Sequence, residues 1–369
     1  RMQKKFLAIA AAVCLFAGTA QAKGVTIAVA GPFSGPAANF GEQLKNGAEQ
    51  AAKDINAAGG ILGQPLTVKY FDDACDPKQA VTVANQIVGE KIPFVVGHFC
   101  SGSTIPASRV YADEGVLMIT PGATNPQITQ QGYKNIFRVV GQDNDQGSSI
   151  AKYVLENFPG KNIALVHDKQ TYSKGLVEAV AKTLEPGKAK IQLRENVNVG
   201  EKDYTSLVTR LKQNNIDVLV YGGYQNEAGL ITRQMREQGL KTVMIGGDAI
   251  SSIDYWAITG KAGEGTLFTS PPDLTKNPAN KKLLNEFKSA KKSADGYTIY
   301  SYATLKLWAD TVNKIGAAEP SKVIAALRGG EHDTPMGKLG FDDKGDIKNA
   351  SFAVYKFTGG KIEQVSDGK

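Results

Sequence analysis

Hydroxyl side chains follow a short apolar segment of this 369-residue chain and could bind an anion. After residues 94–97, Ser101, Ser103 and Thr104 open a stretch with helical spacing. Backbone N–H groups at the start of a helix, assisted by hydroxyls, suit a carboxylate or a phosphate. The alternative is that Ser101 or Ser103 simply caps the helix, and this feature alone favours neither interpretation.

More polar and aromatic residues follow other apolar segments. They include Thr124 in the turn at residues 120–126, and Tyr172, Tyr224 and Asp248 in the second half of the chain. In open α/β sheets, ligands bind outside the carboxyl ends of the strands. A single tyrosine at such a place fits core packing better than a binding role. The prediction of a binding site therefore requires that several of these turns lie next to one another in the folded protein.

The common catalytic and nucleotide-binding motifs are missing from the sequence. The turn at residues 31–36 contains prolines, which lack the N–H groups that a pyrophosphate needs. There is no Walker A motif, no His-Glu-x-x-His and no Gly-x-Ser-x-Gly. His167 and His332 have no identifiable Ser or Cys partner, so a structural role is favoured for both. We expect a binding protein rather than an enzyme, with no catalytic residue and no cofactor.

The N-terminal segment has the pattern of a secretory signal peptide. Three basic residues precede an apolar run at residues 6–18, and small residues up to Ala22 end it. The run is shorter than the roughly 20 apolar residues that span a bilayer. The alternative, a buried core helix, lacks a capping residue. We expect residues 1–22 to be removed after Ala22 and the exported protein to be unanchored.

Charge and cysteine content narrow the function further. The formal net charge is +7, but removal of residues 1–22 leaves 40 Lys and Arg against 36 Asp and Glu, without a basic run. This balance gives no support for a nucleic-acid partner. Export also leaves two cysteines, Cys75 and Cys100, which in an oxidising compartment most simply form one disulfide. The alternative is a metal site that adds His98 to them, and we expect no such site.

Short apolar segments alternate with helical patterns along most of the chain. Strands are predicted at residues 25–30, 66–71, 94–97, 116–120, 163–167, 191–194, 218–221 and 243–245. Repeated βαβ units of this kind form a parallel sheet with helices on both faces. The units fall into two sets separated at residues 137–144, with a second crossing at residues 266–272. Helices are also predicted at residues 280–292 and 297–315, but their spacing does not say which half they join.

Several blocks of the chain match one known family. They are residues 31–36, 72–80, 97–101, 119–124, 167–172, 222–224 and 340–346. With these blocks the sequence resembles the bacterial periplasmic leucine/isoleucine/valine-binding proteins, type I periplasmic binding proteins that serve ABC transporters. The resemblance implies an α/β fold of two doubly wound, Rossmann-like parallel-sheet lobes joined by three crossovers. The lobes would comprise residues 23–140 plus 272–350 and residues 141–271 plus 351–369, with a disulfide between Cys75 and Cys100.

The resemblance also implies a role for each site residue. Ser101 and Thr124, with nearby N–H groups, would bind the α-carboxylate of an L-amino acid. Its ammonium would contact the Gly122 carbonyl, the Thr124 hydroxyl and the Asp248 carboxylate, with Tyr172 close by from the opposite lobe. The pocket for the ligand side chain would be walled by Phe40, Phe99, Cys100, Tyr224 and Tyr297. Both charges of an enclosed zwitterion need such partners, because their desolvation is costly.

Three positions depart from the usual family pattern. Phe99 stands where a leucine is usual, Gly122 where an alanine is usual, and Asp248 where a glutamate is usual. We expect a monomer that binds leucine, isoleucine or valine and delivers it to membrane permease subunits. Alanine, threonine, phenylalanine or a γ-amino acid are alternative ligands. Two other hypotheses are a cytoplasmic regulator that senses amides on the same fold and a secreted hydrolase or oxidoreductase.

Overall fold

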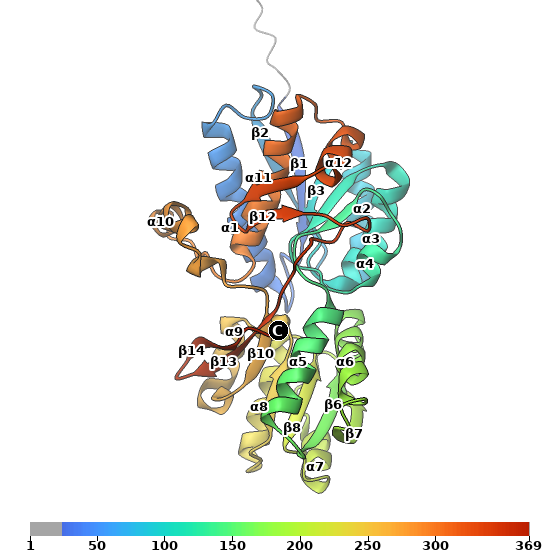
Figure 1. Cartoon of the computed structure of the whole chain (residues 1–369), viewed down its shortest axis with the longest axis vertical. Coiled ribbons are helices and arrows are strands. Elements are labelled where there is room, and N and C mark those ends of the chain that lie inside the picture. The colour runs from blue at the N-terminus through green and yellow to red at the C-terminus, as the bar shows by residue number, and fades with distance from the viewer. Residues whose placement is uncertain (1–23, 369) are drawn as a thin grey trace, which may run out of the picture.

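The computed structural model describes residues 24–368, so the predicted signal peptide, residues 1–22, lies outside the described residues. Figure 1 shows two lobes, one above the other, each with its own sheet. The described chain passes between them within residues 139–142, 271–273 and 341–352. This architecture confirms the predicted α/β fold class of two lobes with three crossovers.

The first lobe is built on five parallel strands in the order β2-β1-β3-β4-β5. They are β1 (Val25–Gly31), β2 (Leu66–Asp72), β3 (Phe94–Gly97), β4 (Leu117–Thr120) and β5 (Ile136–Arg138). Ile27 and Val29 of β1 face one buried cluster, and Ala28 and Ala30 face the other. Alternate side chains of a strand point to opposite faces, so apolar residues in succession indicate a sheet covered on both sides.

Helices cover both faces of this sheet. One face carries α1 (Ala38–Ala57), α11 (Thr298–Ile315) and α12 (Pro320–Arg328). The other carries α2 (Pro77–Gly89), α3 (Ser101–Glu114) and α4 (Gln127–Gln130). Outside these layers lie α10 (Lys281–Ser289), the short 3-10 turns η3 (Leu274–Lys276) and η4 (Pro278–Asn280), and the two-stranded ribbon of β11 (Glu331–Thr334) and β12 (Gly337–Gly340).

The helix α11 packs on α1 although the two are far apart in the sequence. A Cβ atom at Gly47 would lie 2.1 Å from the carbonyl oxygen of Thr298, so only glycine allows the two backbones to approach this closely. The Ser301 hydroxyl donates to the Leu44 carbonyl at 2.7 Å. The helices after the second crossing therefore pack on the first lobe, which their spacing alone could not decide.

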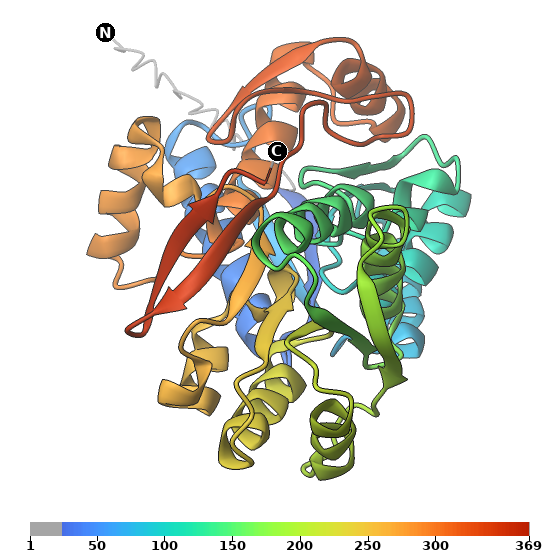
Figure 2. The ribbon, with the colours of Figure 1, turned by 60° about the horizontal axis from the view of Figure 1, so that its bottom comes forward.

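The second lobe has seven strands in the order β14-β13-β10-β9-β8-β6-β7. They are β6 (Asn162–His167), β7 (Lys190–Asn196), β8 (Val218–Gly222), β9 (Val243–Gly246), β10 (Leu267–Ser270), β13 (Ala353–Thr358) and β14 (Lys361–Ser366). β13 runs antiparallel to β10, and Figure 2 shows the pair β13–β14 in red at this edge of the sheet. The lobe's helices are α5 (Asp143–Asn157), α6 (Thr171–Leu184), α7 (Thr205–Gln213), α8 (Gln225–Glu237) and α9 (Ile253–Thr259), with 3-10 turns η1 (Asp248–Ile250) and η2 (Gly260–Gly263).

Several strands were not predicted from the sequence. β5 and β10 lie directly before crossings, where only a break between lobes was predicted. β14 and the ribbon of β11 and β12 were also missed. Their residues are mostly exposed, so they lack the apolar runs that identify buried strands. Within residues 24–368, no helix combines the length and apolar character needed to cross a membrane.

Candidate ligand-binding site

The turns that follow the strands of the two lobes meet around one small buried cavity. Its lining consists of Phe99, Ser101, Gly122, Thr124, Tyr172, Tyr224, Asp248 and Ala249. All but Ala249 were predicted site residues. The other three predicted residues lie directly behind this lining, because Phe40 stacks on Phe99, Tyr297 bonds to Asp248, and Cys100 precedes Ser101. The structure thus brings the predicted residues of both lobes together.

The anion-binding half of the cavity comes from the first lobe. Ser101 is the first residue of α3, and Cys100 before it provides no side-chain cap. The hypothesis that Ser101 or Ser103 caps this helix is therefore wrong. The Ser101 hydroxyl instead accepts from the Asn125 N–H at 3.2 Å, which ties α3 to the turn after β4. An uncapped helix start beside a serine hydroxyl is chemically suited to a carboxylate.

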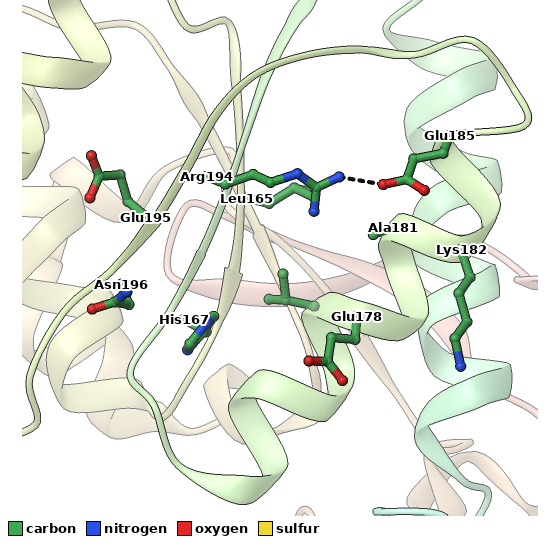
Figure 3. Close-up of a pocket in the computed structure, with 10 residues that line it drawn as sticks. Leu165, His167, Glu178, Ala181, Lys182, Glu185, Arg194, Glu195 and Asn196 are labelled. Carbon is green, nitrogen blue, oxygen red and sulfur yellow. Dashed lines mark hydrogen bonds and ion pairs between the residues drawn. The ribbon is translucent and has the colours of Figure 1, made fainter.

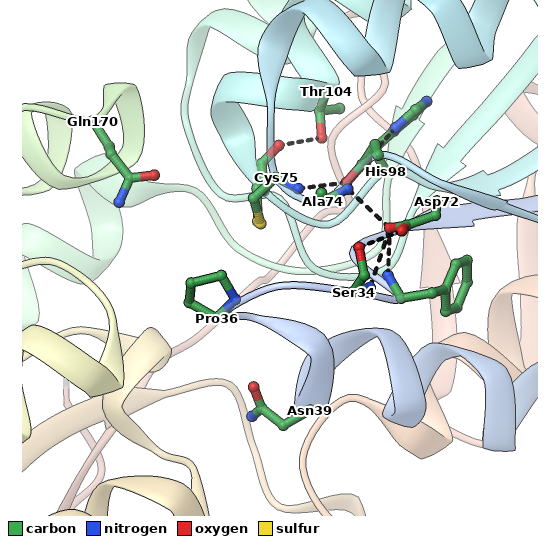
Figure 4. The surroundings of a disulfide bond; sticks show 12 residues. Ser34, Pro36, Asn39, Asp72, Ala74, Cys75, His98, Thr104 and Gln170 are labelled. Carbon is green, nitrogen blue, oxygen red and sulfur yellow. Dashed lines mark hydrogen bonds and ion pairs between the residues drawn. A yellow bond between two sulfur atoms is a disulfide. The ribbon is translucent and has the colours of Figure 1, made fainter. Parts of the chain in front are cut away.

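A disulfide between Cys75 and Cys100 fixes the start of α3, which confirms the predicted pairing. The two Cα atoms are 5.5 Å apart, and Figure 4 shows Cys75 in the turn beside Asp72 and His98. His98 is buried between Asp73 Oδ2 at 2.6 Å and the Tyr111 hydroxyl at 2.9 Å. This geometry gives the metal-site alternative no support, because the two sulfurs are bonded to each other and both ring nitrogens of His98 have hydrogen-bond partners. No cluster of metal-binding side chains occurs within residues 24–368.

The cation-binding half of the cavity centres on Asp248, which is only 3% exposed. The Tyr172 hydroxyl donates to Asp248 Oδ1 at 2.8 Å, and the Tyr297 hydroxyl donates to Oδ2. Burial raises the pKa of Asp248, while these hydroxyls favour its ionised form. Tyr297 belongs to the first lobe, so its bond to Asp248 also links the two lobes. The resemblance assigned Tyr297 only to the side-chain pocket.

Two buried polar residues of α5, Asp143 and Gln146, were missed by the sequence analysis. The Gln146 Oε1 atom accepts from the Asp248 N–H at 2.8 Å and from the Thr269 hydroxyl at 2.9 Å. Its Nε2 atom donates to Asp143 Oδ1 at 2.9 Å. The sequence does contain a signal for them: two polar residues three positions apart, on one side of a helix that begins at the end of the predicted break at residues 137–144. It resembles ordinary helix-start polarity, which explains the omission.

An aromatic wall closes the side of the cavity in the first lobe. The Phe99 ring stacks on Phe40, with centroids 4.4 Å apart and planes at 15°, and meets Tyr297 edge-on at 5.0 Å. A Cβ atom at Gly122 would lie 2.4 Å from a carbon of the Phe99 ring. The large Phe99 and the small Gly122 are therefore matched, and the two departures from the family pattern compensate each other in space.

The lobes are closed over this site. The Asn39 amide donates to the Ser252 hydroxyl at 2.9 Å, and Gln225 donates to the Pro36 carbonyl at 3.1 Å and to Asn39 Oδ1 at 3.0 Å. The cavity between the lobes measures about 10 Å³. This volume holds about one water molecule. An amino acid can therefore enter only when the lobes separate.

A larger cavity of about 470 Å³ lies within the second lobe, between α6 and the strands β6 and β7. Figure 3 shows charged side chains of both signs around it, with Arg194 bonded to Glu185. Apolar atoms of Leu165 and Val177 contribute to its lining. None of the predicted site residues lines it. Its charged side chains form ion pairs, with Arg194, Glu178 and Glu195 among them, or face solvent, so we assign the site to the cavity between the lobes.

Comparisons with known proteins agree with this geometry. A family model described as periplasmic binding protein matches residues 24–361. The Leu/Ile/Val-binding protein of Escherichia coli is 45% identical over 341 residues, 92% of each chain. The leucine-, isoleucine-, valine-, threonine- and alanine-binding protein of Pseudomonas aeruginosa is 44% identical over 334 residues, 90% of each chain. The solved structure of the branched-chain amino acid transporter substrate binding protein LivJ from Streptococcus pneumoniae, in complex with isoleucine, matches with a TM-score of 0.84 at 26% identity, covering 93% of this chain and 100% of that one.

Proposed function

The chain belongs to the periplasmic binding protein family, and we propose that it captures branched-chain L-amino acids between its lobes and delivers them to the permease of an ABC transporter. The observation that carries this proposal is a closed cavity with an uncapped helix start and hydroxyls on one side and the buried Asp248 carboxylate on the other. These groups match the two charges of an amino acid. The aromatic wall of Phe40, Phe99 and Tyr297 suits an apolar side chain.

The ligand contacts that we propose follow the chemistry of each group. Ser101, the first turn of α3 and the backbone N–H of Thr124 bind the α-carboxylate. The Gly122 carbonyl, the Thr124 hydroxyl and Asp248 bind the ammonium. The polar contacts fix the class of ligand, while the matched pair of Phe99 and Gly122 shapes the pocket and thereby the ranking among leucine, isoleucine, valine and the smaller or aromatic alternatives.

Titration calorimetry on protein freed of bound ligand tests this function. We expect saturable binding of leucine, isoleucine or valine with a Kd at or below the micromolar range, about 8 kcal/mol of binding free energy. Each of the twenty amino acids is titrated separately, which also ranks alanine, threonine and phenylalanine. An absence of saturable heat with all twenty would overturn the proposal.

Substitution of Asp248 tests the site itself. Asp248→Ala removes the carboxylate that we place against the ammonium, and we expect binding to weaken by about 2 to 4 kcal/mol because that charge is left unpaired. The matched control is Glu178→Gln, which alters an acidic residue of the larger cavity in the second lobe. The control should bind as the unchanged protein does. Equal affinities of the Asp248 variant and the control would remove Asp248 from the site.

We also propose that the segment at residues 1–22 directs export and is cleaved after Ala22. The disulfide between Cys75 and Cys100 supports an oxidising compartment, since such bonds persist mainly outside the cytoplasm. Mass spectrometry of the protein from a periplasmic extract should give a mature chain that begins at Lys23. Recovery of the mature protein with residues 1–22 attached would contradict this proposal and favour the cytoplasmic alternative.

A further inference from the structure

Asp143 is a fully buried acid directly behind the candidate site. It is 0% exposed and begins α5, immediately after the first crossing between the lobes. Its backbone N–H donates to the Thr124 carbonyl at 2.8 Å, so the residue is fixed to the turn that lines the cavity. One carboxyl oxygen, Oδ1, accepts from Gln146, while the other, Oδ2, has no hydrogen-bond partner. A buried carboxylate oxygen without a hydrogen-bond partner is costly, and such a group in a native protein points to a functional role.

Several neighbouring groups set the protonation of Asp143. Burial and the neighbouring Asp248 carboxylate raise the pKa of Asp143 to about 7, while the Thr124 hydroxyl, the Arg138 guanidinium and Gln146 favour its ionised form. Arg138 is held by Asp346, to which it donates at 2.6 Å. Tyr172, Tyr224 and Tyr297 also lie near Asp143, and burial raises their pKa values, so their hydroxyls stay neutral. On the same helix, burial also raises the pKa of Asp145, which interacts with Arg138 and Asp346.

We propose that Asp143 is a positioning residue of the ammonium site and that ligand binding requires its ionised form. This inference rests on the proposed function. The ionised carboxylate accepts the hydrogen of the Thr124 hydroxyl, which leaves the Thr124 oxygen free to accept from the ligand ammonium. It also adds a second negative charge beside Asp248. The ammonium in turn stabilises ionised Asp143, so a protein molecule in which Asp143 is protonated releases that proton to the buffer when it binds.

The sign of the pH effect follows from this exchange. In the closed structure the pKa of Asp143 is raised to about 7, and an ammonium bound beside it would lower that pKa, so binding is strongest at high pH. Below pH 7 a proton must leave before the ligand binds, and the Kd rises by up to tenfold per pH unit. We expect leucine to bind about tenfold more weakly at pH 6 than at pH 8. Calorimetry at pH 6.5 in two buffers of different ionisation heat should show proton release.

Two variants separate Asp143 from other groups. In Asp143→Asn the carboxamide cannot titrate, so we expect at least tenfold weaker binding at pH 8 and a Kd that no longer changes between pH 6 and pH 8. The control is Glu156→Gln, which removes an exposed acid near the other end of the same helix and should keep the pH profile of the unchanged protein. Circular dichroism checks that both variants are folded.

Two results would contradict a role for ionised Asp143 in binding. A Kd of the unchanged protein that is flat from pH 6 to pH 8, with no buffer-dependent heat, overturns it. It is also overturned if Asp143→Asn keeps the pH dependence, since Asp248 or another group would then release the proton. The calorimetry on the unchanged protein does not depend on any variant folding. Failure of the proposed function looks different, because no amino acid would then bind at any pH.

Discussion

At the scale of single residues, Phe99 and Gly122 show how neighbours share one volume. The Phe99 ring fills the space that a side chain at residue 122 would need, since a Cβ atom there would lie 2.4 and 2.5 Å from two of its carbons. The ring cannot retreat easily, because Phe40 stacks on it and Tyr297 meets its edge. The effect of changing the size of one of these residues therefore depends on the size of the other.

The substitution Gly122→Ala tests this coupling. We expect leucine binding to weaken by about 1 to 3 kcal/mol, the usual cost of overpacking, because the added methyl pushes the Phe99 ring into the pocket. The double variant Gly122→Ala with Phe99→Leu should recover most of the affinity, since the shorter side chain makes room. Calorimetry on the two single variants and the double variant gives the coupling energy. Strictly additive effects of the two changes would show that the residues do not share this space.

At the scale of elements, the start of α3 is the part of the site that depends most on a covalent link. The disulfide joins Cys75, in the turn after β2, to Cys100, the residue before α3. His98 adds buried hydrogen bonds to Asp73 and Tyr111 in the same region. The turn after β2 and the start of α3 therefore hold each other in place, and Ser101 takes its position from both.

Removal of the disulfide should lower the stability of the protein. The loop that it closes has a sequence separation of 25 residues. Such a loop corresponds to about 3 to 4 kcal/mol in the chain-entropy model. We expect the double substitution Cys75→Ala and Cys100→Ala to lower the free energy of unfolding by this amount in urea denaturation. A midpoint equal to that of the unchanged protein would show that the surrounding hydrogen bonds hold this region without the covalent link.

Elements with buried apolar runs could be predicted from the sequence, and those defined by distant pairing could not. The buried residues of β1 and β3 are apolar or small, and the apolar residues of α11 recur at helical spacing, so the local sequence pattern was enough to predict these elements. β14 is mostly exposed and exists because β13 pairs with it. In the site, strand-end turns identified Ser101 and Thr124. Asp143 could not be found in this way, since its importance arises from burial beside Asp248, which only the assembled lobes create.

At the scale of the whole molecule, the two lobes are joined by chain crossings on one side and by hydrogen bonds across the cleft on the other. Arg138, directly before the first crossing, bonds to Asp346, inside the third, and to the carbonyl of Asn125 at 2.8 Å. These bonds link the crossings to the turn that contains Thr124. We propose that the two lobes move as rigid bodies about these crossings.

The contacts of Asn39 across the cleft should control how fast the ligand leaves. Asn39 bonds to Ser252 and to Gln225, both in the opposite lobe, and these bonds exist only when the lobes are closed. Asn39→Ala removes both, at about 1 kcal/mol each, so we expect roughly 30-fold faster release of leucine in stopped-flow fluorescence. Asn85→Ala, on the exposed side of α2, should release leucine at the unchanged rate. Equal rates for the two variants would show that Asn39 does not hold the cleft closed.

The small cavity between the lobes also determines when a ligand can enter or leave the protein. The cavity of about 10 Å³ is too small to hold an amino acid, so the lobes must separate for an amino acid to bind or to leave. A transporter that separates the two lobes would therefore release the ligand without contacting any residue that binds it.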